Sequence, residues 1–80
     1  MIFLIEYDRE QGRIVKLEAF NGSDRNRAEE ARLNLELALR SKEIDNEVVL
    51  LDAANEEAVR RTHRRYFEDL HQLASPSPGK

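Results

Sequence analysis

Residues 1–7, MIFLIEY, constrain the fold most because they are apolar on both faces of a strand. In an extended chain, alternate side chains point to opposite faces, which puts Ile2 and Leu4 on one face and Phe3, Ile5 and Tyr7 on the other. A strand with one face in water would alternate apolar and polar residues instead. This stretch is therefore expected to be a central strand that is covered on both sides.

The rest of the chain supplies two further strands and two helices. Residues 8–13, DREQGR, are typical of a hairpin loop in which Gly12 can adopt a positive φ. Residues 13–20 alternate apolar and charged side chains, a pattern that suits an edge strand with one solvated face. Residues 46–53 contain four consecutive apolar residues and predict the third strand.

Two longer segments predict helices. Residues 21–46 are rich in Ala, Leu, Glu and Arg, and Ser23 or Asp24 can cap the helix. Four leucines there, at positions 33, 35, 37 and 39, alternate as in a strand, but the segment has no β-branched residue before Ile44, and we interpret it as helix. Residues 54–74 predict the second helix, with Asn55 as its cap.

The resulting order, ββαβα, predicts one α+β domain over residues 1–74 and a disordered tail over residues 75–80, which contain two prolines and a glycine. Because the second and third strands are joined through a helix, they should run parallel. We place the first strand between them and antiparallel to both. This gives a three-stranded mixed sheet of order 2-1-3, a split βαβ arrangement with both helices on one face.

This arrangement leaves more apolar surface than one small chain can bury. One face of the first strand is left without cover, and residues 48–51 form an apolar edge with no guarding charge. Leu33 and Leu37 fall on the side of their helix opposite to its apolar stripe. A symmetric homo-oligomer, with a dimer favoured, would cover such surface. Its candidate interface residues are Leu33, Leu37, Val48 and Leu50.

Residues 60–67, RRTHRRYF, suggest nucleic-acid or partner binding through Arg60, Arg61, Arg64 and Arg65. On a helix, however, each arginine has an acid four residues away: Glu56, Glu57, Glu68 and Asp69 respectively. A phosphate-binding face would leave its cations unpartnered, and the net charge of −3 argues against a general polyanion binder. We therefore favour a solvated helix face, with nucleic-acid contact as the alternative.

His63 and Tyr66 are the best candidates for chemistry, since they lie one turn apart and could line a pocket with Tyr7. No motif supplies a nucleophile or an orienting carboxylate, so we assign no catalytic residue. The spacing of His63 and His71 does not match a helical metal pair, and no glycine-rich phosphate loop occurs. We expect no metal and no cofactor, and packing is the favoured role of the two side chains.

These observations predict a small, non-catalytic interaction or regulatory module that acts through homo-oligomerisation and protein–protein contact. A chain without cysteine fits a reducing, cytoplasmic setting, and the longest apolar run is too short to span a membrane. Two alternatives remain open. One is a nucleic-acid-binding regulatory protein that uses the arginine cluster, and the other is a small-molecule-binding or enzymatic domain with a pocket near His63 and Tyr66.

Overall fold

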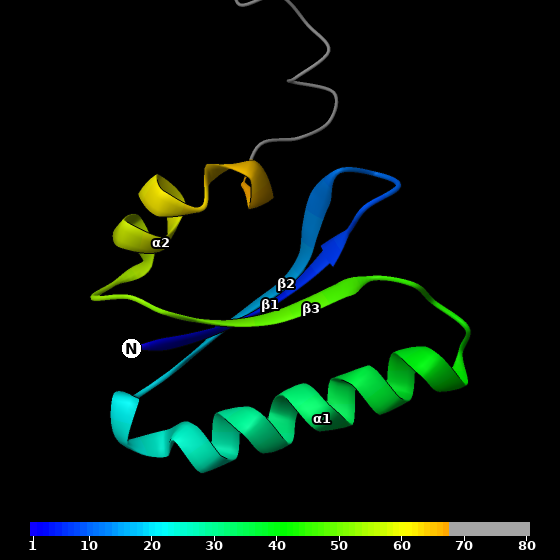
Figure 1. Ribbon diagram of the computed structural model, residues 1–80, viewed down its shortest axis with the longest axis horizontal. Coiled ribbons are helices and arrows are strands. Elements are labelled where there is room, and N and C mark those ends of the chain that lie inside the picture. The colour runs from blue at the N-terminus through cyan, green and yellow to red at the C-terminus, as the bar shows by residue number, and fades with distance from the viewer. Residues whose placement is uncertain (68–80) are drawn as a thin grey trace, which may run out of the picture.

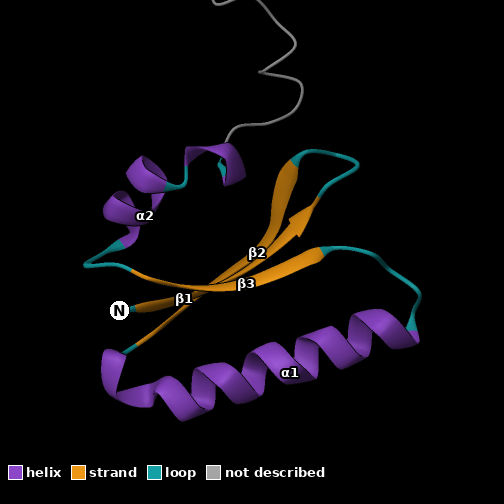
Figure 2. Cartoon of the chain, in the orientation of Figure 1, coloured by secondary structure: helices purple, strands orange, loops and turns teal. Residues whose placement is uncertain are grey.

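The computed structural model describes residues 1–67 of the chain. They form the strands β1 (Ile2–Asp8), β2 (Arg13–Phe20) and β3 (Glu47–Asp52) and the helices α1 (Arg25–Ser41) and α2 (Glu56–Thr62). Two short 3-10 turns, η1 (Gly22–Asp24) and η2 (Arg64–Tyr66), precede α1 and follow α2. The element order ββαβα is confirmed, whereas the expected tail over residues 75–80 lies outside the described residues (Figure 2).

The three strands form one sheet of order β2-β1-β3, as the sequence predicts. β1 is antiparallel to both neighbours, and its Leu4 lies opposite Glu18 of β2 and Leu50 of β3. β2 and β3 run parallel to each other, but they are not neighbours, so both hydrogen-bonded pairs of these three strands are antiparallel and the expectation of a mixed sheet is wrong. β1 takes the centre because it is the strand whose side chains are buried on both faces, from Ile2 to Tyr7.

The two helices lie on opposite faces of this sheet (Figure 1), so the expectation that both lie on one face is wrong. Val59 of α2 packs against Phe3 and Ile5 on one face of β1. α1 crosses the other face, where Ile2 and Leu4 are buried. The physical reason is that β1 is apolar on both sides. Two helices on one face would leave the other face of β1 in water.

The loop between β1 and β2 is closed by hydrogen bonds to Asp8. The Asp8 carboxylate accepts hydrogen bonds from the backbone N–H groups of Glu10 and Gln11, each at 3.0 Å. Gly12 has a φ of 69°, which costs glycine little, and its N–H donates to the Asp8 carbonyl oxygen at 2.7 Å. The hairpin predicted from Asp8 and Gly12 is confirmed.

α1 confirms the helical interpretation of the alternating leucines. Ala28 and Leu39 face the sheet and are buried. Leu33 and Leu37 remain 53% and 51% exposed, on the side that the helical period assigns them. Within residues 1–67, no helix is long and apolar enough to cross a membrane.

α2 is shorter than the helix predicted over residues 54–74. Asn55 caps it as expected, its side chain accepting a hydrogen bond from the N–H of Ala58 at 2.8 Å. The helix ends at Thr62, because His63 adopts a φ of −124° and a ψ of 52°. The turn that follows brings Tyr66 into a buried position. Packing of this aromatic residue on the sheet outweighs the helical propensity of the arginine-rich segment.

Candidate interaction surface

The hydrogen bonds at the end of β3 determine which of its backbone groups face β1 and which face outward. The N–H of Ala53 donates to the Met1 carbonyl oxygen at 3.0 Å, and the Met1 amino group donates to the Ala53 carbonyl oxygen at 2.8 Å. Hydrogen-bonded and non-hydrogen-bonded pairs alternate along an antiparallel ladder. Val49 and Leu51, which precede Ala53 by four and two residues, therefore direct their N–H and C=O groups toward β1.

The alternate residues of β3 direct their backbone groups away from β1. Val48, Leu50 and Asp52 point their N–H and C=O groups away from β1, and no other strand within residues 1–67 pairs with them. Such an outward row of donors and acceptors is a template for pairing with another strand. The side chains of Val48 and Leu50 are only half-buried, so the edge is apolar as well as unpaired.

The opposite edge of the sheet differs from β3 in two respects. β2 carries a bulge, where the register shifts between Glu6 and Tyr7 and Val15 is left as the extra residue. It also carries the exposed charges Lys16 and Glu18, 3.8 Å apart. Bulges and charges are the usual devices that prevent edge-to-edge association. β3 has neither between Val48 and Leu51, so the two edges are chemically unequal.

α1 flanks the β3 edge with a stripe of alternating charge. Its members recur at helical spacing on one side: Arg25, Glu29, Arg32, Glu36 and Arg40. Neighbours along the stripe form ion pairs: Arg25–Glu29 at 3.7 Å, Arg32–Glu29 at 3.1 Å and Arg32–Glu36 at 3.7 Å. Arg25 also donates to the carboxylate of Asp52, which fastens the start of α1 to the end of β3.

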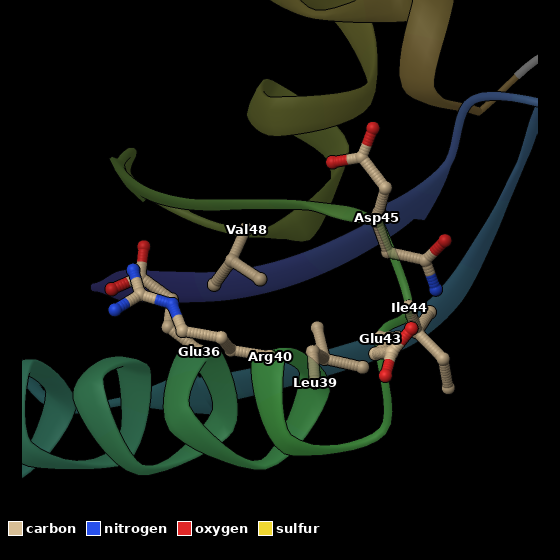
Figure 3. Close-up of a pocket in the computed structure, with 8 residues that line it drawn as sticks. Glu36, Leu39, Arg40, Glu43, Ile44, Asp45 and Val48 are labelled. Atoms are coloured by element: carbon tan, nitrogen blue, oxygen red, sulfur yellow. The ribbon is translucent and has the colours of Figure 1, made fainter.

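Two shallow grooves follow each other between this stripe and the strand. One, of 400 Å³, is lined by Arg25, Glu29 and Arg32 of α1 and by residues 48–51 of β3. The other, of 460 Å³, is lined by Glu36, Leu39 and Arg40, by residues 43–46 and by Val48. Figure 3 shows Val48 projecting from β3 toward the helix that carries Glu36 and Leu39. Because Val48 lines both, we refer to them together as the β3–α1 groove.

The four residues predicted for an oligomer interface fall on two surfaces. Val48 and Leu50 line the β3–α1 groove. Leu33 and Leu37 are exposed on α1 and line neither part of it. Arg25 and Glu36, which line the groove, are absent from the predicted interface. The signal for them was the helical spacing of the stripe, combined with a neighbouring edge strand.

The predicted arginine cluster is divided between α2 and η2, and its two α2 members contact acidic and aromatic side chains. Arg60 donates to the Glu56 carboxylate at 2.8 Å, and its guanidinium carbon lies 4.6 Å from the centre of the Phe67 ring. Arg61 lies 3.7 Å from Glu57. These are two of the four ion pairs expected from the spacing. The other two involve Glu68 and Asp69, which lie outside the described residues, as does the side chain of Arg65; Arg64 is exposed.

Tyr7, His63 and Tyr66 are brought together, but as a packed cluster. The rings of Tyr7 and Tyr66 meet edge to face with their centres 5.1 Å apart, and His63 lies 6.4 Å from Tyr66. Both tyrosines are buried, and the Tyr66 hydroxyl donates to the carboxylate of Glu47 at 2.7 Å. None of these three residues lines the β3–α1 groove or the groove at the hairpin end of the sheet. This geometry supports a structural role for the cluster.

A third groove, at the hairpin end of the sheet, is strongly acidic. Its lining includes five carboxylates: Glu6, Asp8, Glu10, Glu43 and Asp45. Glu6 is 7% exposed, and its carboxylate accepts a hydrogen bond from the Asn46 side chain at 2.7 Å. Within residues 1–67, no three His, Asp or Glu side chains are arranged to hold a metal ion. The buried Glu6 is thus satisfied by a neighbouring amide.

Comparison with known proteins identifies no relative, because no protein family, curated protein or solved structure matches this chain.

Proposed function

We propose that this chain is a small, non-catalytic interaction or regulatory module that works in the cytoplasm through homo-oligomerisation and protein–protein contact. Its contact surface is the outward edge of β3 together with the β3–α1 groove. A chain without cysteine does not depend on an oxidising compartment for disulfides, which is why we favour the cytoplasm.

The observation that carries the proposal is the unguarded edge of β3. Val48, Leu50 and Asp52 direct backbone donors and acceptors outward, and apolar side chains lie along the same edge. Strand addition to such an edge combines main-chain hydrogen bonds, which give affinity, with side-chain pockets, which give specificity. The adjoining groove supplies both apolar and charged side chains for that purpose.

Nucleic-acid binding has less support, because Arg60 and Arg61 are already paired with acids of their own helix. A pocket enzyme has less support because the rings of Tyr7 and Tyr66 pack against each other. Nucleic-acid binding and a pocket enzyme are therefore the alternatives to this proposal.

The test is the mass of the chain in solution by light scattering at tens of micromolar. We expect a dimer, with twice the 9.3 kDa of one chain. Leu50→Lys should shift the protein to monomer, because it puts a charge in the middle of the pairing edge. Leu37→Lys is the matched control, since the same substitution on the exposed side of α1 leaves the β3 edge unchanged.

Circular dichroism establishes that both variants are folded. A wild-type chain that is monomeric at this concentration would contradict the proposal. A dimer lost in Leu37→Lys but retained in Leu50→Lys would move the interface to the outer side of α1.

A further inference from the structure

We propose that the partner at the β3 edge is a second copy of this chain, paired antiparallel about a two-fold axis at Leu50, with Arg25 of each copy against Glu36 of the other. This inference rests on the proposed function and adds to it a defined register and a specific charged contact.

The backbone restricts the possible registers. A two-fold axis that pairs two edge strands antiparallel must be perpendicular to the sheet, so α1 of both copies lies on the same face and paired residues share a face. The residues that bond across the junction must be those whose N–H and C=O groups point outward, namely Val48, Leu50 and Asp52. Pairing is therefore centred on Leu50 or shifted from it along the strand.

The Leu50-centred register uses only residues of β3. It pairs Leu50 with the partner's Leu50, and Val48 with the partner's Asp52. A register centred on Val49 would pair Asp52 with the partner's Asn46, which lies outside β3. The Leu50-centred pairing also places the half-buried apolar residues of the two strands side by side at the centre of the junction.

The charges of α1 favour the same register. Arg25 is hydrogen-bonded to Asp52, whereas Glu36 lines the groove beside Val48. Since Val48 of one copy faces Asp52 of the other, Glu36 of one copy is brought to Arg25 of the other. The two-fold axis repeats this contact, so the dimer contains two such pairs of opposite charge.

The groove beside Val48 offers an incoming arginine side chain both apolar and acidic neighbours, and Arg40 of α1 also lines it (Figure 3). Leu39, Ile44 and Val48 provide apolar surface for the arginine stem, while Glu36 and residues 43 and 45 provide carboxylates for its head. Arg25 has 50% of its side chain exposed, and Glu36 has 39% exposed, so both are accessible to a partner.

The test exchanges the two charges between separate chains. Arg25→Glu and Glu36→Arg each turn both contacts of a homodimer into repulsions, and each variant alone should dimerise at least about tenfold more weakly than wild type. In an equimolar mixture, one chain of each kind restores two attractive pairs, and dimers should reappear with affinity close to wild type. Sedimentation equilibrium measures the dissociation constants.

Arg27→Glu is the matched control, because Arg27 is exposed on α1, undergoes the same charge change and does not line the groove. It should leave the dimer affinity within about twofold of wild type, as a surface charge remote from the contact does. Circular dichroism melting of each variant excludes unfolding as the cause of dissociation.

If the mixture of Arg25→Glu and Glu36→Arg is no more dimeric than either variant alone, the proposed register is wrong. If Leu50→Lys still dissociates the wild-type dimer in that case, the proposed function stands. A monomeric wild type overturns both. In a monomeric wild type, protection of the Val48 and Leu50 amides from hydrogen exchange would show that another segment of the chain occupies the β3 edge. Free exchange of these amides would show that the edge is open, and any partner would then be a different protein.

Discussion

At the scale of residues, two sequence signals that act on their own backbone are confirmed, whereas Asp24 precedes α1 without the side-chain cap hydrogen bond expected from Ser23 or Asp24. Asn55 caps α2 and Asp8 closes the hairpin, as their residue types predict, because each side chain bonds to a backbone N–H two or three residues away. Glu6 is the contrasting case. Its burial depends on Asn46, 40 residues along the chain, and no local pattern identifies that partner.

The Asn55 cap leads to a prediction about stability. Asn55→Ala removes the acceptor for the Ala58 N–H and should lower the free energy of unfolding by about 1 kcal/mol. Asn34→Ala, at an exposed site inside α1, is the control and should slightly raise stability through helix propensity. Urea denaturation followed by circular dichroism measures both, and equal effects would show that the cap contributes nothing.

At the scale of elements, the sequence predicted which segments are helices and strands more accurately than where they end. α1 is helical despite its alternating leucines, and Leu33 and Leu37 lie on its exposed side while Leu39 is buried. α2 stops at Thr62, although the helical pattern continues for another turn. The stop depends on Tyr66 reaching Tyr7 and Glu47, contacts between parts of the chain that only the fold brings together.

α2 is attached to the sheet mainly through Val59, which is fully buried against Phe3 and Ile5. Val59→Ala removes two buried methyl groups and should lower the free energy of unfolding by about 2 kcal/mol. Val15→Ala is the matched control, since Val15 is 53% exposed at the bulge of β2, and it should change stability by less than about 0.5 kcal/mol. A similar loss in both variants would refute the role of Val59 as the anchor of α2.

At the scale of the whole molecule, the two helices cover opposite faces of the sheet. This arrangement moves the surface available for association from a sheet face to a sheet edge. Both faces of β1 are covered, so the open sheet face expected from the sequence does not exist. Within residues 1–67, the apolar edge that has no strand partner is that of β3, beside the charged side of α1. Association through an edge differs from association through a face because it adds backbone hydrogen bonds between copies.

Hydrogen exchange followed by NMR detects that difference. If the proposed dimer forms, the outward amide of Leu50 should become protected as protein concentration rises through the dissociation constant. The amides of Val49 and Leu51 should be protected at every concentration, because they bond to β1 within one chain. Protection of Leu50 that does not change with concentration would contradict association through this edge.

The sequence by itself determined the class, the order of elements and the position of β1 at the centre of the sheet. These follow from local periodicity and from the requirement that a strand apolar on both faces be covered. Tertiary structure alone decided on which face each helix lies, where α2 ends and which charges meet the β3 edge. Those outcomes depend on contacts between residues far apart in the chain, such as Arg25 with Asp52 and Tyr66 with Glu47, and the spacing of residues in one segment does not encode them.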